Sequence, residues 1–104
     1  MALPDPVIAY VALGSNLGDR RGHLEAAFAA LDRLPGTRLL ARSGLYETAP
    51  VGPPGQQDYL NAAAELSTAL EPLELLEALL SIEQARGRVR RERWGPRTLD
   101  LDLL

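Results

Sequence analysis

The chain has 104 residues, of which 46% are hydrophobic and 24% charged, a composition typical of one globular domain spanning residues 1–104. It has no cysteine and one histidine, which excludes a disulfide framework, a thiolate metal site and a histidine-based triad. The net charge of −3 argues against general nucleic-acid binding, and because we find neither a membrane-spanning run nor a signal peptide, we expect a cytoplasmic protein.

The amino-terminal third predicts a strand, a turn and a helix. Residues 7–13 are apolar and β-branched, as in a buried strand, and Gly14-Ser-Asn-Leu-Gly18 follows as a turn. Ser15 and Asn16 could instead contact a ligand directly. Asp19 then opens a helix that ends before Pro35-Gly36. Its apolar residues recur at helical spacing: Leu24, Ala27, Phe28, Leu31 and Leu34.

The middle of the chain predicts two more strands. Residues 38–46 read as one strand, and the proline-rich residues 47–55 as a loop that is either a stiff connector or a binding loop. Residues 59–70 alternate between two faces, which predicts a third strand, although the alanines leave helix as a competitor.

A second helix and a last strand complete the order. Glu71-Pro72 starts the helix and Gly87 is its expected stop. The residues expected to face inward are Leu73, Leu76, Leu79, Leu80 and Ile82. The resulting order, β-α-β-β-α-β, is that of an α+β, ferredoxin-like fold, in which an antiparallel sheet carries both helices on one face. We expect the first and last strands to be its central pair.

The last strand carries two carboxylates. Because side chains alternate along a strand, Asp100 and Asp102 point to one face while Leu99, Leu101 and Leu103 point to the other. Two such carboxylates repel unless a cation lies between them, and oxygen ligands suit Mg²⁺. The alternative is an edge strand whose solvent face happens to be acidic.

Positive charge is concentrated just before this strand. All eleven basic residues are arginine, and residues 1–85 carry a net −6 whereas residues 86–104 carry +3. Guanidinium groups bind phosphate oxygens in pairs, so this cluster suits a small polyphosphate, although it could also be a solvated face. Trp94, in a charged Gly-Pro loop, either anchors that loop or covers a flat ligand.

Three further residues are candidates for the same pocket. Tyr59 and Asn61 share a face of the third strand and offer a flat ring and an amide, which together suit a planar heterocycle with donors and acceptors. A cross-strand aromatic contact and a polar surface residue are the alternative. Glu83, on the second helix one turn before the arginines, could face the pocket or be an exposed glutamate.

Taken together, these motifs resemble a known family, the 6-hydroxymethyl-7,8-dihydropterin pyrophosphokinases of folate biosynthesis. The matching segments are Gly14-Ser-Asn-Leu-Gly, Tyr46-Glu-Thr-Ala-Pro-Val-Gly, Asp58-Tyr-Leu-Asn-Ala, Ile82-Glu, Gly87-Arg-Val-Arg and Arg93-Trp-Gly-Pro-Arg-Thr-Leu-Asp-Leu-Asp-Leu-Leu. The last of these is highly specific, and the others are strong jointly.

The resemblance implies a ferredoxin-like enzyme that uses ATP and Mg²⁺ to transfer a diphosphate to the hydroxymethyl group of the pterin, releasing AMP. It places magnesium on Asp100 and Asp102, with Asp100 also nearest the reacting hydroxyl. It implies ATP contacts by Glu83, Arg88, Arg90, Arg93, Trp94 and Arg97, of which Arg88 and Arg97 would also be catalytic. It implies a pterin pocket formed by Thr48, Val51, Tyr59 and Asn61, over which the loop carrying Trp94 closes.

The resemblance covers the whole chain but only the amino-terminal part of the family's usual length. We therefore expect these residues to be part of a longer protein, and turnover to be weak or absent if they are the complete product. A noncatalytic ferredoxin-like module that binds nucleotide is the main alternative, and a self-associating structural domain is another. The sequence indicates no oligomeric state.

Overall fold

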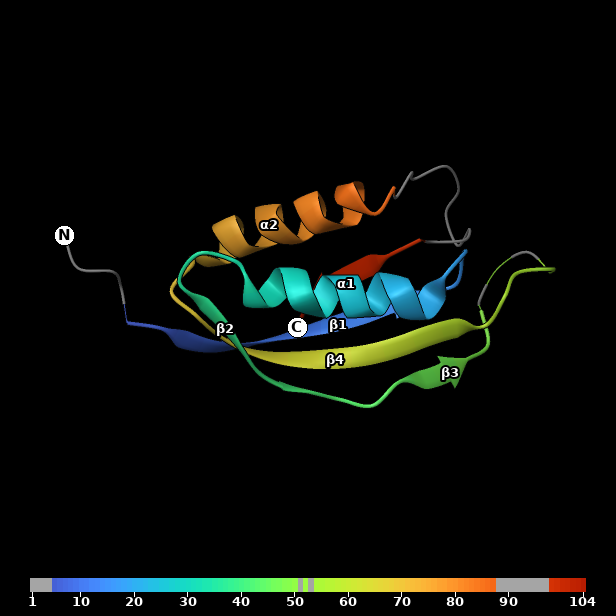
Figure 1. Ribbon diagram of the computed structural model, residues 1–104, viewed down its shortest axis with the longest axis horizontal. Helices are drawn as coiled ribbons and strands as arrows, with labels where there is room; N and C mark the ends of the chain where they lie inside the picture. Colours follow the sequence, from blue (N-terminus) through green and yellow to red (C-terminus); the bar gives the residue numbers. More distant parts are fainter. Residues whose placement is uncertain (1–4, 51, 53, 88–97) are drawn as a thin grey trace.

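The computed structural model describes residues 5–50, 52, 54–87 and 98–104. Its elements are β1 (Val7–Ser15), α1 (Arg20–Asp32), β2 (Thr37–Arg42), β3 (Tyr46–Thr48), β4 (Tyr59–Thr68), α2 (Pro72–Ala85) and β5 (Asp100–Leu103). All strand pairs are antiparallel, and both helices lie on the same side of the sheet (Figure 1). This arrangement confirms the predicted α+β, ferredoxin-like fold. No helix among the described residues is both long and apolar enough to cross a bilayer.

Local signals set the helix ends as expected. The Asp19 carboxylate accepts the main-chain N–H of Gly22 at 3.0 Å and so caps α1. Pro72 occupies the first turn of α2, where its missing N–H costs nothing. Gly87, two residues beyond the end of α2, has φ +80°, a left-handed conformation that glycine adopts without strain.

The predicted second strand, residues 38–46, ends at Arg42 as β2, and β3 overlaps the prediction only at Tyr46, because Glu47 and Thr48 were expected in the loop. β2 pairs with the distal half of β4 and β3 with its beginning, so both occupy the same edge. Between them, Ser43 donates its N–H to the Ala63 carbonyl at 2.9 Å, and its Oγ accepts the Ala63 N–H at 2.8 Å. The serine side chain therefore replaces a main-chain ladder bond, and the strand is interrupted there.

The expectation of a central pair formed by the first and last strands is wrong. The strand order is β2-β4-β1-β5, so β4 and β1 are central and β5 lies at the edge of the described sheet. β1 and β4 pair over nine residues, whereas β5 offers only four. β5 nevertheless pairs directly with β1, so Asp100 lies beside Gly14 at the start of the glycine-rich segment.

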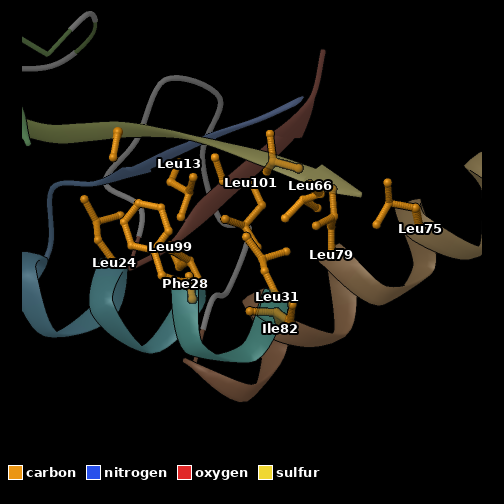
Figure 2. Packing of buried hydrophobic residues seen from close by; sticks show 14 of the residues in the cluster. Leu13, Leu24, Phe28, Leu31, Leu66, Leu75, Leu79, Ile82, Leu99 and Leu101 are labelled. Carbon is orange, nitrogen blue, oxygen red and sulfur yellow. The ribbon is translucent and has the colours of Figure 1, made fainter. Parts of the chain in front are cut away.

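The core lies between the two helices and the sheet (Figure 2). Leu24, Ala27, Phe28 and Leu31 of α1 are buried as predicted, and β4 buries every second residue from Leu60 to Thr68, which excludes the helical alternative. Among the described residues, the buried apolar ones are Val11, Leu13, Leu24, Ala27, Phe28, Leu31, Leu60, Ala62, Ala64, Leu66, Leu75, Leu79, Ile82, Leu99 and Leu101.

The predicted inward face of α2 is partly wrong. Leu79 and Ile82 are buried, but Leu73, Leu76 and Leu80 are exposed. Their places in the core are taken by Leu75 and, unexpectedly, by Glu83. Because leucines surround this helix, periodicity alone could not select the stripe that packs against β5.

Candidate functional site

One row of residues crosses the open face of the sheet, the face that neither helix covers. In the register, Gly14 of β1 lies opposite Asn61 of β4 on one side and opposite Asp100 of β5 on the other. Residues that pair across antiparallel strands point to the same face. With strands about 4.8 Å apart, the Cα atoms of Asn61 and Asp100 are separated by roughly 10 Å. The candidate pterin residues and the acidic strand thus share one site.

Gly14 forms the floor between them. A Cβ atom on Gly14 would lie 3.3 Å from Oδ1 of Asn61 and 3.4 Å from Cδ1 of Tyr59. The Tyr59 ring and the Asn61 amide therefore lean over the main chain of β1, where a side chain would crowd them. Sequence reasoning assigned Gly14 to a turn and missed this role, because the requirement comes from a strand 45 or more residues away.

The Asn61 amide has a fixed orientation. Its Nδ2 donates to Oγ1 of Thr48 at 2.7 Å and to the main-chain oxygen of Tyr46 at 3.3 Å. With the NH₂ group directed at β3, the amide oxygen is turned toward Gly14. The structure thereby brings together Thr48, Tyr59 and Asn61, three of the residues that the resemblance assigns to the pterin pocket, and presents a hydrogen-bond acceptor beside a flat aromatic ring.

The two acids lie next to this pocket. Asp100 is half-buried and Asp102 exposed, whereas Leu99 and Leu101 are buried on the opposite face, so the predicted alternation is confirmed. The small Ala12 lies opposite Asp102 in the register. No cluster of three or more potential metal ligands occurs among the described residues. Two carboxylates fit Mg²⁺, which usually takes one or two of them and completes its coordination with water and phosphate oxygens.

Glu83 supports the acidic strand from the helix side. It is only 3% exposed, and its Oε2 accepts the main-chain N–H of Leu101 at 2.7 Å. Leu101 stands between Asp100 and Asp102, so the carboxylate of α2 fixes the main chain that carries both acids. Its predicted contact with the nucleoside stays a prediction.

The connection between β1 and α1 fastens the segment that precedes β4. Ser15 and Asn16 are buried, and Nδ2 of Asn16 donates to Oε1 of Gln56 at 2.9 Å and to the carbonyl of Gln57 at 3.3 Å. These contacts favour a structural role for the turn. The remaining predicted site residues, Val51, Arg88, Arg90, Arg93, Trp94 and Arg97, lie outside the described residues.

A cleft of about 820 Å³ opens elsewhere, between the start of α1 and the β2–β3 connection. Four of its charged groups form two ion pairs: Arg42 bonds both oxygens of Glu25 at 2.9 and 2.7 Å, and Arg20 lies 3.2 Å from Glu47. The Arg42 hydrogen bond holds the pKa of Glu25 below its usual value. Because the cleft is lined by as many carboxylates as arginines, it is poorly suited to a polyphosphate, and the open face is the better candidate.

His23 links the two helices near the same end of the sheet. Its Nδ1 accepts the Nε–H of Arg86 at 3.0 Å. Burial and the positive charge of Arg86 lower the pKa of His23, and Asp19 opposes them more weakly. The imidazole therefore acts as a neutral acceptor.

Comparison with known proteins points in the same direction. A sequence model of the family 7,8-dihydro-6-hydroxymethylpterin-pyrophosphokinase matches residues 10–104. Proteins named 2-amino-4-hydroxy-6-hydroxymethyldihydropteridine pyrophosphokinase are similar to this chain. The one from Pseudomonas aeruginosa is 57% identical over 95 residues, which are 91% of this chain and 59% of that protein. The one from Pseudomonas putida is 58% identical over 92% of this chain and 79% of its own length. The one from Bacillus subtilis is 50% identical over 93% of this chain and 58% of its own length.

Proposed function

The chain belongs to the 7,8-dihydro-6-hydroxymethylpterin-pyrophosphokinase family, and we propose that it transfers the diphosphate of ATP to the hydroxymethyl group of 6-hydroxymethyl-7,8-dihydropterin in folate biosynthesis. The row formed by Asp100, Gly14 and Asn61 carries this proposal, because it sets a flat, polar pocket beside two acids on one face. The chain spans about three fifths of the length of the Pseudomonas aeruginosa relative. A cytoplasmic location stays a prediction from the sequence.

The proposed pocket holds the pterin by stacking and by hydrogen bonds. The Tyr59 ring covers one face of the heterocycle, and the Asn61 amide oxygen accepts a hydrogen bond from its edge. Thr48 orients the amide through the 2.7 Å bond. The hydroxymethyl group would then be directed along the row toward Asp100. The resemblance to the family adds Val51 and Trp94 to this pocket.

On the other side, Asp100 and Asp102 would hold magnesium. The ion, when bound, neutralises charge on the phosphate oxygens. Glu83, Arg88, Arg90, Arg93, Trp94 and Arg97 would contact ATP. In the reaction, the hydroxyl oxygen bonds to the β-phosphorus, the bond from that phosphorus to the oxygen bridging to the α-phosphate breaks, and AMP leaves. The hydroxyl loses its proton, for which Asp100 is the nearest candidate acceptor. The protein mainly positions the reactants, which is what phosphoryl-type transfer requires.

The test is product analysis with the natural protein that carries this sequence. We expect ATP and the hydroxymethyl-dihydropterin to give AMP and a pterin diphosphate only with Mg²⁺, and Asp102→Asn to reduce the rate by at least about a hundredfold. Glu77→Gln, on the exposed side of α2, is the matched control and should leave the rate unchanged. Formation of ADP would exclude the proposal. Binding of Mg²⁺-ATP without AMP release at saturating pterin would indicate a nucleotide-binding module instead.

A further inference from the structure

Arg20, in the first turn of α1, joins the two ends of the segment that links β3 to β4. Its Nη1 donates to the main-chain oxygen of Asp58 at 2.8 Å, and its Nη2 donates to Oε1 of Glu47 at 3.2 Å. Glu47 directly precedes Thr48 and Asp58 directly precedes Tyr59. One guanidinium therefore spans the base of the segment, immediately before each of two candidate pterin residues.

Thr48 and Tyr59 are also paired across the sheet. They form the last of the three register pairs between β3 and β4, at the point where the chain leaves the sheet. β3 has only three residues and all of them are exposed, so little packing holds it in place. The polar contacts at its end accordingly matter more than they would on a long, buried strand.

The contact comes from the side of the sheet that faces the helices. Glu47 pairs with Leu60, and Leu60 is buried on the helix side, so Glu47 points to that side too. Thr48, Tyr59 and Asn61 face the open side, where the proposed ligand binds. Arg20 does not line the candidate pocket, and any effect on it must act through the main chain of β3 and β4.

The arginine fork suits this task. A planar guanidinium donates in two fixed directions at once, which an ammonium group on a flexible stem cannot reproduce. The ion pair with Glu47 contributes little by itself, since the two side chains are 25% and 60% exposed. The bond to the Asp58 carbonyl is what ties the helix to the main chain directly before Tyr59.

We propose that Arg20 is a positioning residue for the pterin pocket. By holding Glu47 and Asp58 together, Arg20 fixes the distance between Thr48 and Tyr59. Because Thr48 accepts a hydrogen bond from Asn61, Arg20 also fixes the orientation of the amide that binds the edge of the heterocycle. Asn16, in the connection between β1 and α1, bonds to Gln56 and Gln57 and is a second point at which this segment is held. The ligand part of this inference rests on the proposed function.

The test compares Arg20→Ala and Arg20→Lys with Arg21→Ala. Arg21 is the adjacent exposed residue of α1, so its replacement makes the same change of charge in the same helical turn. Alanine favours helix, and we expect all three variants to fold. The first measurement is hydrogen exchange of residues 54–61 in the ligand-free protein. The second is calorimetric titration with 6-hydroxymethylpterin, and the third is titration with Mg²⁺-ATP.

We expect Arg20→Ala to accelerate exchange in residues 54–61 and to weaken pterin binding about five- to tenfold, with ATP binding unchanged. Arg20→Lys should restore neither property fully, and Arg21→Ala should change neither. Unchanged exchange and pterin affinity in Arg20→Ala, or equal effects of Arg21→Ala, would overturn the inference. A wild-type chain that binds no pterin would refute the proposed function and the ligand part of this inference, whereas the exchange data would still decide whether Arg20 holds the segment.

Discussion

Replacing Glu83 tests how the acidic strand is held. The carboxylate is 3% exposed and accepts the Leu101 N–H at 2.7 Å. A hydrogen bond to a charged acceptor contributes about 1.5–3 kcal/mol, and a buried N–H left without its acceptor costs about 1–3 kcal/mol. We therefore expect Glu83→Ala to lower the free energy of unfolding by about 3 kcal/mol, which is a large part of the stability of a domain of this size.

Glu83→Gln separates the hydrogen bond from the charge. An amide oxygen can still accept the Leu101 N–H, so we expect a loss of only about 1 kcal/mol. Urea unfolding followed by circular dichroism measures both values, and in thermal unfolding Glu83→Ala should lower the melting temperature by more than about 10 °C. Glu77→Ala, on the exposed side of the same helix, is the control and should stay within about 0.5 kcal/mol of the wild type.

The same variants have a second readout at the site. Since Leu101 stands between Asp100 and Asp102, loosening its main chain should weaken Mg²⁺-ATP binding in Glu83→Ala more than in Glu83→Gln. A Glu83→Ala protein that melts within about 2 °C of the wild type would refute the reasoning, because the carboxylate would then not hold β5.

Three other predictions concern the pocket floor, the helix contact and the core. Gly14→Ala places a Cβ 3.3 Å from Oδ1 of Asn61, so we expect calorimetry to show about tenfold weaker pterin binding, with less than about 1 kcal/mol change in the free energy of unfolding. Unchanged affinity would contradict the assignment of Gly14 to the floor of the pocket. The pKa of His23 in the folded protein lies below its ordinary 6.5, so below pH 6.5 the unfolded chain binds more protons than the folded one, and the free energy of unfolding should decline as the pH falls and level off above pH 6.5. In urea unfolding between pH 5 and 8, His23→Gln should remove this decline. Parallel profiles for His23→Gln and the wild type would exclude His23 as its cause. Leu31→Ala, at a residue with 0% exposure, should cost about 3 kcal/mol in the same assay, and a loss below about 1 kcal/mol would mean that α1 packs loosely.

Features set by neighbouring residues could be predicted from the sequence. The cap at Asp19, the start of α2 at Pro72 and the alternation along β4 all depend on local chemistry, and the structure has each of them. The interruption at Ser43-Gly44 also has a local signal, since such a pair commonly marks a turn. The apolar residues on either side of the pair nevertheless favour one continuous strand.

Features set by distant partners could not be predicted. Leucines surround α2, and only its packing against β5 selects Leu75 over Leu73 for the core. β5 lies at the edge of the described sheet because β2 and β3 pair with β4, and this choice of partner involves residues far apart in the sequence. At the site, the alternation of side chains along a strand predicts that Tyr59 and Asn61 share a face, and that Asp100 and Asp102 do. It cannot predict the need for glycine at position 14, which arises from side chains of another strand.

The hydrogen bond between Glu83 and Leu101 has a consequence for association between molecules. A strand at the border of a sheet normally leaves main-chain groups that a foreign strand can bind, and this is a common start of aggregation. Here the outward N–H of Leu101, in the strand at the border of the described sheet, is occupied by the Glu83 side chain from α2. An approaching strand would meet a carboxylate in place of a donor, so the same contact that steadies the acids also protects this border from unwanted sheet extension.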